Sequence, residues 1–430
     1  MVTAMVTATE TRIRIVGLMR NVSRATLTKT NFIRLLLIIS FGALLAYASA
    51  TSALVSVART KNYQTALALD DKDPTALAVK ADNLFFRARD RASLTQVRQL
   101  ASASLQSQAL NARAMRLLAY SEEKLAAAPK SRAYIDIATR LSRRELGAQI
   151  WLIEQYVAAD DAAGALRHYD TALRTNTAIQ LPLFTQLTAG IELPIIQQAL
   201  APYVRADPPW LRSFLTHAIG NSANPASIVS VVKVAGGMPE HEAFRDLEKQ
   251  LLSQLFAKGQ FAVARKYYLG LPGAKPSVLT SLGFDADNMS SRSGPLGWQL
   301  VQGASTGANW SGGEGDQALT AFANSGERGL IARKWLFLAP GNYRIDLTFG
   351  TANMPDASAI EWTINCLSEA PPVTIWRSGP MRPVSGTKAK GTAQVGYECP
   401  FQSIEIAMAG GESQNGAELS VQSVQIARQR

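Results

Sequence analysis

Residues 35–58 read LLLIISFGALLAYASATSALVSVA, a stretch of 24 residues without a charged side chain. As an α-helix it would extend about 36 Å, which is enough to cross a hydrocarbon core of about 30 Å. A charged side chain would be costly in such a core, and none interrupts the stretch. We therefore predict a transmembrane helix over residues 35–58.

The charges on either side of this stretch predict its orientation. Residues 1–34 contain six basic side chains and a single acidic one, Glu10, within a chain of formal net charge +11. The positive-inside rule keeps such a flank in the cytoplasm and places residues 59–430 across the membrane. We expect a single-pass protein of a bacterial inner membrane, with a basic cytoplasmic tail and the bulk of the chain in the periplasm. The tail either rests on anionic headgroups or is a solvated, disordered leader.

A cleaved signal peptide is the competing interpretation. Ala46-Tyr47-Ala48 and Ala48-Ser49-Ala50 both match the small-x-small pattern of a cleavage site. Such a leader would be unusually long, and apolar residues continue to Ala58, which favours an uncleaved anchor. Both interpretations export the rest of the chain.

Length and charge limit the remaining possibilities. The chain has 430 residues, enough for two folded domains beside a membrane segment, and its 47% hydrophobic content is typical of folded cores. Much of the basic excess lies in the tail, and no later segment pairs a dense basic run with interleaved aromatic residues. The sequence therefore does not indicate nucleic-acid binding.

Residues 59–275 carry helical periodicity. Trp151–Asn176 reads WLIEQYVAADDAAGALRHYDTALRTN, two amphipathic stretches around a short acidic turn. Three residues of the second stretch lie at i, i+4 and i+7: Ala165, Tyr169 and Ala172. Leu251–Pro272, LLSQLFAKGQFAVARKYYLGLP, places Ala264 and Tyr268 in the same way. Small residues at such positions let two helices pack closely, while the tyrosine fills the gap between pairs.

These two stretches resemble tetratricopeptide repeats, helix–turn–helix units of about 34 residues with small and aromatic residues at such places. Weaker copies precede them, because Tyr120 and Tyr156 take like positions, and Leu94–Gln106 and Arg132–Arg144 would be second helices. Prolines interrupt the pattern over about 177–240, where we expect helices of irregular length. The resemblance implies an α-solenoid that binds protein partners on a concave surface. The alternative is a solenoid that only supports the next domain.

The composition changes over residues 276–430, where helical periodicity disappears and five of the seven tryptophans lie. Trp335–Gly350, WLFLAPGNYRIDLTFG, contains a Pro-Gly-Asn turn, after which the inward-facing Tyr343, Ile345, Leu347 and Phe349 alternate with other residues. Further sets of inward-facing residues are Trp362, Ile364 and Cys366; Val395, Tyr397 and Cys399; Ile404, Ile406 and Met408; and Leu419 and Val421, then Val424 and Ile426 after a bulge near Gln422.

The block GPLGWQLV, the LAPGNYRIDLTF hairpin and the final strand pair resemble the jelly-roll sandwiches of carbohydrate-binding, galactose-binding-like modules. The resemblance implies an antiparallel jelly-roll-like β-sandwich over residues 276–430 and a glycan as its ligand. The whole fold is then multidomain α and β, with a transmembrane helix, a tetratricopeptide-like α-solenoid and a C-terminal β-sandwich.

Cys366 and Cys399 share the parity of neighbouring apolar residues, so both should point inward. We predict a disulfide across the sandwich, which fits an oxidising compartment, with two buried free thiols as the alternative. The two cysteines are too few for a four-ligand zinc site, and no metal is expected.

Sugar recognition usually needs an exposed aromatic ring with polar groups nearby. Trp310 lies in the glycine-rich stretch GANWSGGEGDQ, where we expect an exposed loop. Trp376 has the opposite parity to Val373 and Ile375 and precedes Arg377, so it should also be exposed. We therefore predict ligand binding by Trp310, Trp376 and Arg377, and place Trp335 and Trp362 in the core.

Signals for catalysis are weak in the sequence. The three histidines all lie in the helical part, and His241-Glu242 does not continue into a zinc-protease motif. No nucleophile elbow or phosphate-binding glycine loop occurs, so no catalytic residue and no cofactor is predicted. Paired carboxylates of a glycosidase would meet only in space, which leaves that enzyme as a third interpretation.

The domain pairing indicates a membrane-anchored, non-catalytic scaffold of the cell envelope. In this interpretation the repeats bind protein partners and the sandwich binds a glycan, in assembly or export of a surface polysaccharide. The alternative is a protein–protein interaction adaptor with no sugar site.

Overall fold

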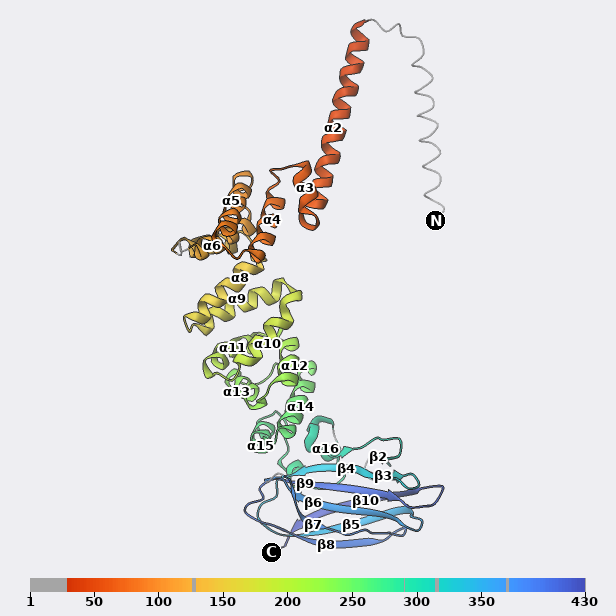
Figure 1. The fold of residues 1–430 in the computed structure, drawn as a ribbon. Coiled ribbons are helices and arrows are strands. Elements are labelled where there is room, and N and C mark those ends of the chain that lie inside the picture. The colour runs from red at the N-terminus through yellow and green to blue at the C-terminus, as the bar shows by residue number, and fades with distance from the viewer. Residues whose placement is uncertain (1–28, 126–128, 290, 314–316, 369–370, 430) are drawn as a thin grey trace, which may run out of the picture. The chain divides into compact units, whose positions relative to one another are not determined.

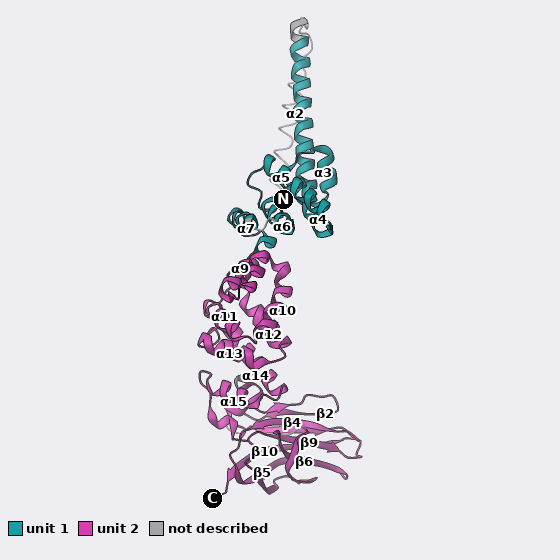
Figure 2. Cartoon of the chain, turned by 60° about the vertical axis from the view of Figure 1, so that its left-hand side comes forward, with its two compact units in different colours: residues 1–149 teal, residues 150–430 magenta. Residues whose placement is uncertain are grey.

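The computed structural model describes residues 29–429 except 126–128, 290, 314–316 and 369–370 (Figure 1). The chain divides into two compact units, residues 1–149 and 150–430 (Figure 2). Helices are followed by two antiparallel sheets at the C-terminus, which confirms the multidomain α and β class. Most of the basic tail lies outside the described residues. The predicted domain bounds, 1–34, 35–58, 59–275 and 276–430, stay a prediction.

The first described element is α2, Lys29–Lys61. Its most apolar 18-residue window has a mean hydropathy of 2.0, and none of that window is buried. It is the only helix long and apolar enough to cross a membrane among the residues that the structure describes. Length and composition suit a signal sequence as well as an anchor, so both interpretations stay open. Near its end, Val55 packs with Ala66 and Ala76 of the next two helices.

The rest of the first unit is a set of short helices that contact their sequence neighbours. Their bounds are α3 Tyr63–Leu69, α4 Pro74–Arg87, α5 Arg91–Ser107, α6 Ala112–Lys124 and α7 Pro129–Leu141. Asp73, Asp90 and Asn111 each accept a hydrogen bond from the N–H three residues later, which caps α4, α5 and α6. Alanines such as Ala78, Ala81 and Ala101 line the core of this unit and let the helices approach closely.

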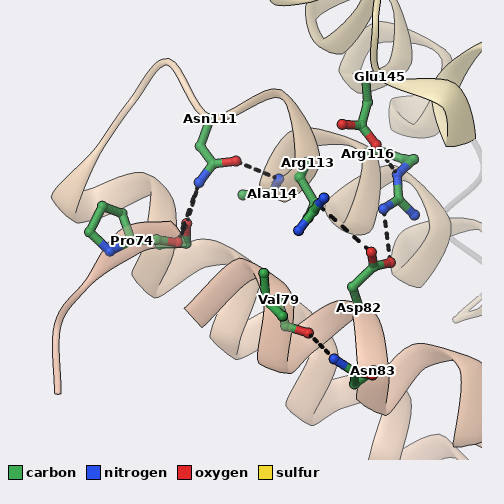
Figure 3. Close-up of polar contacts among 10 residues, drawn as sticks. Pro74, Val79, Asp82, Asn83, Asn111, Arg113, Ala114, Arg116 and Glu145 are labelled. Carbon is green, nitrogen blue, oxygen red and sulfur yellow. Dashed lines mark hydrogen bonds and ion pairs between the residues drawn. The ribbon is translucent and has the colours of Figure 1, made fainter. Parts of the chain in front are cut away.

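A buried guanidinium joins three segments of this unit (Figure 3). Arg116 on α6 is 4% exposed; its Nη2 lies 2.8 Å from Oδ1 of Asp82 on α4, and its Nε lies 2.7 Å from Oε1 of Glu145. Burial by itself lowers the pKa of Arg116, but the carboxylates of Asp82 and Glu145 outweigh it and raise that pKa. The cation therefore stays charged. It joins α4, α6 and Glu145, which directly precedes the helix Leu146–Ala158.

The helices that follow form two layers. Their bounds are α8 Leu146–Ala158, α9 Ala162–Thr175, α10 Gln180–Gly190, α11 Pro194–Ala206, α12 Leu211–Asn221, α13 Pro225–Ala235, α14 Glu242–Ala257 and α15 Phe261–Leu269. Helix α11 contacts both α9 and α13, while α12 contacts both α10 and α14. The residues predicted to pack between helices are buried: Ala165, Tyr169, Ala172, Ala264 and Tyr268.

Three prolines of the middle region lie at helix starts, whereas Pro202 lies inside α11. Pro194 and Pro225 are the first residues of α11 and α13, and Pro182 lies in the first turn of α10. Proline costs little at these positions, because the N–H that it lacks would have no partner within the helix. The four helices α10 to α13 have 11 to 13 residues each, so the expected irregular lengths are wrong.

The C-terminal part is a sandwich of two five-stranded sheets in the described part of the chain. Strand bounds are β1 Gln299–Leu300, β2 Thr306–Ser311, β3 Ala318–Ala323, β4 Arg328–Leu336, β5 Gly341–Asn353, β6 Ser358–Cys366, β7 Val373–Arg377, β8 Lys388–Val395, β9 Gln402–Gly410 and β10 Ala417–Arg428. The first sheet has the order β1-β4-β9-β6-β7 and the second β2-β3-β10-β5-β8. The inward residues predicted on β5, β6 and β9 are buried, and β10 carries register shifts on both sides of Val421, as the phase shift near Gln422 predicted.

The two cysteines form a disulfide, with their Cα atoms 5.5 Å apart. Strand β8 ends at Val395, however, and Cys399 lies in the turn that follows. Alternation does not continue through a turn, and Tyr397 is 90% exposed. Its predicted inward orientation is therefore wrong.

A connector of short helices precedes the sandwich and closes one of its edges. It contains η2 Pro276–Leu279, α16 Ala286–Met289 and η3 Ser291–Leu296. Leu282 and Trp298 from this connector are buried in the core between the sheets, and Phe284 packs against it.

The Arg116 cluster gives a prediction for stability. Arg116→Met would leave the carboxylates of Asp82 and Glu145 without their shared cation. We therefore expect the free energy of opening of α4 and α6 to fall by about 3–5 kcal/mol. Hydrogen exchange of the full chain measures this. Arg132→Met, which removes an exposed pair with Asp136, is the control and should cost less than about 1 kcal/mol. Equal effects of the two changes would contradict the role given to Arg116.

Candidate functional site

The outer side of the first sheet gathers polar and charged side chains. On β6, Trp362, Ile364 and Cys366 are buried, so the residues between them point away from the core. The same alternation on the other strands of this sheet defines what we call the charged face. It consists of Arg328, Leu330 and Arg333 on β4, Glu405, Ala407 and Ala409 on β9, Ala359, Glu361, Thr363 and Asn365 on β6, and Thr374 and Arg377 on β7.

Strand register brings four of these residues into one row across the sheet. Glu405 is paired with Arg333 on one side and with Thr363 on the other, and Thr363 is paired with Arg377. Directly opposite side chains on neighbouring strands lie roughly 5 Å apart, close enough to interact. The row therefore alternates hydrogen-bond donors and acceptors over the width of the four strands.

Two glutamates anchor the arginines of this face. Nε of Arg333 lies 2.7 Å from Oε1 of Glu405, and Nη2 of Arg328 lies 3.0 Å from Oε2 of Glu361. Nε of Arg377 lies 3.8 Å from the other oxygen of Glu361, too far for a hydrogen bond. The Glu361 side chain is 13% exposed, whereas both arginines beside it are largely exposed. Glu361 thus orients two guanidinium groups that still face solvent.

Hydroxyl and amide groups extend the face along the strands. Oγ1 of Thr374 donates a hydrogen bond of 2.8 Å to Oδ1 of Asn365 on the neighbouring strand. Three alanines, Ala359, Ala407 and Ala409, lie half-buried among the charged side chains. In register, Ala409 lies between Arg328 and Ala359, and Ala407 lies beside Glu361, so the short side chains lie near one end of the charged face.

Trp335 lies at one end of this face and is covered by the helices. Its ring stacks on Phe256 of α14, with centroids 5.0 Å apart, and lies 5.9 Å from Phe261 of α15. The Arg333 guanidinium lies 5.6 Å from the centre of the same ring. Trp335 therefore points away from the sandwich core, and its predicted core position is wrong, whereas Trp362 is fully buried as predicted.

Phe337 and Phe401 complete this aromatic contact between the helices and the sandwich. Phe337 meets Phe256 at 6.2 Å, and Phe401 meets Phe261 at 5.6 Å. Aromatic pairs at such separations contribute beyond their buried area. The pair α14–α15 is thus attached to the sheet that carries the charged face.

Neither tryptophan predicted to bind ligand is an exposed ring. Trp310 lies in β2 rather than in a loop, is half-buried, and its ring lies 5.2 Å from Phe284. Trp376 is opposite the inward-pointing Ile364 and is also half-buried. A Cβ at Gly391 on β8 would lie 2.5 Å from the Trp376 ring, so this indole covers the second sheet at the edge formed by β7 and β8. The expected exposure is wrong for both rings, and their ligand role stays a prediction.

Of the three predicted ligand residues, only Arg377 belongs to the charged face. Glu361, Glu405 and Arg333 were missed, although a signal for them exists in the sequence. They alternate with the apolar residues that marked the strands, so every strand that shows an inward set also defines an outward one. Among the described residues, no group of three or more His, Cys, Asp or Glu side chains could hold a metal ion.

No family model matches this chain, and no curated protein matches it. Similar solved structures include a carbohydrate-binding module described as CBM4, with 14% identity over 31% of this chain and 86% of the other, and a TM-score of 0.23. The CBM22-1 xylan-binding domain of Paenibacillus barcinonensis Xyn10C has 14% identity over 31% and 86% of the chains, with a TM-score of 0.22. Tailspike protein 4 of bacteriophage CBA120 has 12% identity over 31% and 19%, with a TM-score of 0.23. These TM-scores are all below 0.5, so we infer no function from the similarities.

The aromatic contact gives a second prediction. Phe256→Ala should lower the free energy of unfolding by about 3–5 kcal/mol, because it removes a buried ring and uncovers Trp335. Denaturant titration of the full chain, with quenching of tryptophan fluorescence, measures both effects. Phe86→Ala, at an exposed phenylalanine, should change stability by less than about 0.5 kcal/mol. If the two variants behave alike, the contact does not hold the sheet to the helices.

Proposed function

We propose that this chain is a membrane-anchored, non-catalytic scaffold of the cell envelope that binds a glycan through the charged face and protein partners through its helical repeats. The observation that carries the proposal is the row of Arg333, Glu405, Thr363 and Arg377, with the arginine pair on Glu361 beside it. The setting would be assembly or export of a surface polysaccharide.

The chemistry of the face suits a sugar. Each hydroxyl group of a glycan both donates and accepts hydrogen bonds, and it needs partners of both kinds at short spacing. Guanidinium groups supply donors, carboxylates supply acceptors, and Thr363 supplies a hydroxyl group that does both.

Two observations support attachment to a membrane with the sandwich outside the cytoplasm. Helix α2 is apolar and exposed over a length that can span a bilayer. The disulfide between Cys366 and Cys399 fits an oxidising compartment such as the periplasm. Together with the basic residues before α2, they favour an inner-membrane protein with its N-terminus in the cytoplasm.

The helical part supports binding of protein partners. The first helices of three successive pairs begin at Pro74, Ala112 and Leu146, a spacing close to that of tetratricopeptide-like repeats. Stacked helix pairs present a continuous surface on which an extended partner can lie. Leu181, Leu193 and Ile195 are exposed apolar side chains of the second unit that such a partner could cover.

The proposed absence of catalysis rests on how the carboxylates are used. A glycosidase of the usual kind needs one carboxyl group that donates a proton to the leaving oxygen. Glu361 and Glu405 both accept hydrogen bonds from arginine guanidinium groups, which occupies them as acceptors. Their place on the face therefore suits ligand binding better than proton donation.

One observation favours the adaptor as a second candidate function. Trp335 is the only aromatic ring on the charged face within the described residues, and Phe256 already covers it. This end of the face thus binds a protein surface, the chain's own helices, instead of a sugar ring. A second protein could bind the rest of the face in the same way.

Glycan binding is tested by exposing the full-length protein in detergent to a polysaccharide array. Arg377→Ala should weaken retention by about 10- to 100-fold, which corresponds to the loss of one charged hydrogen-bonding group. Arg344→Ala is the matched control, because Arg344 pairs with Asp346 on β5 in the opposite sheet and should leave retention unchanged. If wild-type protein retains no polysaccharide at all, the adaptor is the better account.

The orientation is tested with a reporter enzyme that is active only after export. Fused behind Arg430, the reporter should be active in intact cells, because α2 and its basic flank would place the C-terminus across the membrane. The same reporter fused ahead of Met1 should be inactive. The opposite result for the two fusions would exclude the periplasmic sandwich.

A further inference from the structure

A lysine amine is buried inside the sandwich. Lys334 on β4 is 0% exposed and lies at an inward position between Ala332 and Leu336. Lysine is almost never fully buried without a partner of opposite charge. No salt bridge to Lys334 occurs among the described residues, so the buried amine needs another explanation.

Two oxygen atoms of the connector accept the hydrogen bonds of this amine. Nζ of Lys334 lies 2.8 Å from Oδ1 of Asn288 and 2.6 Å from the carbonyl oxygen of Leu296. A neutral amine has two N–H groups, so these two acceptors satisfy both of its donors. Burial lowers the pKa of Lys334 from 10.5 to about 7, while the charge of Asp285 acts in the other direction and is the smaller effect.

The connector itself fixes the orientation of Asn288. Its Nδ2 donates to Oδ2 of Asp285 at 2.9 Å and to Oγ of Ser281 at 3.2 Å. The amide oxygen must then face the other way, toward Lys334. Oδ1 of Asp285 is also bound, since it accepts the backbone N–H groups of Asp287 and Asn288. The carboxylate is therefore held on the far side of Asn288 and does not pair with the amine directly.

No other charged side chain around Lys334 takes the place of a directly paired carboxylate in the described structure. Asp287 pairs with Lys275 at 2.7 Å, and Arg333 points to the other side of the sheet, where it pairs with Glu405. On β9, the residue in register with Lys334 is the apolar Ile404. Asp285 is thus the one charged group whose effect on Lys334 is resolved in the described structure.

The segment held by this amine closes one edge of the sandwich. We call residues 281–289 and 291–298 the edge plug. The N–H of Trp298 donates to the carbonyl of Asn288 at 2.8 Å, and its indole N–H donates to the carbonyl of Leu282 at 3.1 Å. Phe284 contacts the rings of Trp298 and Trp310 at 6.0 and 5.2 Å. The plug thus fills the space between β4 of one sheet and β2 of the other.

We propose that Lys334, Asn288 and the Leu296 carbonyl form a latch on the edge plug, and that the latch opens when the Lys334 amine takes up one proton from solvent. Protonation adds a third N–H and a full charge to a site with two acceptors and no direct carboxylate. When the plug leaves, the ammonium group gains water as its partner. Opening removes Phe284 and Trp298 from the edge of the sandwich and uncovers Trp310 on β2.

The sign of the pH dependence follows from the pKa of Lys334 in the two states. It is about 7 when the latch is closed and near the ordinary 10.5 when it is open, so opening is coupled to proton uptake between these values. The latch is strongest at alkaline pH and weakens as the pH falls toward 7. Below about 7 both states are protonated, and no further change is expected.

Hydrogen exchange of the full-length protein, corrected for the intrinsic effect of pH on exchange, tests the latch. The opening equilibrium at the Trp298 N–H should rise by roughly 50-fold from pH 9 to pH 7 and by only about twofold from pH 7 to pH 6. An N–H in the opposite sheet, such as that of Leu347, serves as the internal control and should not show this profile.

Two variants separate the latch from a merely structural lysine. Lys334→Met keeps the length of the side chain but removes the proton site, so the pH profile at Trp298 should become flat, whatever the overall stability. Asn288→Asp places a carboxylate beside the amine and should remove most of the change between pH 9 and pH 7. A wild-type profile that is flat, or one that persists in Lys334→Met, would overturn the proposal.

Discussion

A sandwich of two open sheets must close the edges at which the sheets do not meet, and that constraint explains the positions of Phe284, Trp298, Trp310 and Trp376. At one edge the plug packs Phe284 against both Trp298 and Trp310. At the other edge Trp376 covers Gly391. Exposed core at either edge would lose the burial that stabilises the fold, at about 25 cal/mol for each Å² of apolar surface.

The packing of the tryptophans at the sheet edges limits which surface of the sandwich can bind a ligand. Rings that seal an edge are not free to stack on a sugar, and Trp335 is taken by Phe256. The surface that remains is polar, and its specificity must come from the arginines and glutamates that strand register aligns. The guanidinium and carboxylate groups of this surface are already held in ion pairs, which fix their direction. A ligand would therefore be recognised by the direction and spacing of its own hydrogen-bonding groups.

The strands and several of the helices were predictable because their signals are local. Alternation around Tyr343 and Ile345 and the helical spacing of Ala165 and Tyr169 each need only a few neighbouring residues. Trp310 and Trp376 were misplaced because their surroundings come from distant segments, the connector and β8. Tyr397 was misplaced because parity was extended through a turn. Trp335 was placed in the core because a tryptophan in a sandwich is usually buried there, but it packs against Phe256 and Phe261 of helices that are distant in sequence.

Arg116 and Lys334 are two buried basic side chains whose partners come from distant segments, but the chemistry of those partners differs. Arg116 receives a carboxylate from each of two other segments, Asp82 and Glu145, and its pKa is raised. Lys334 receives an amide and a carbonyl oxygen, and its pKa is lowered. A guanidinium with two carboxylates keeps its charge at any ordinary pH, so it can only hold helices together. An amine with two neutral acceptors can exist without its proton, and this difference makes the edge plug, unlike the helical core, responsive to pH.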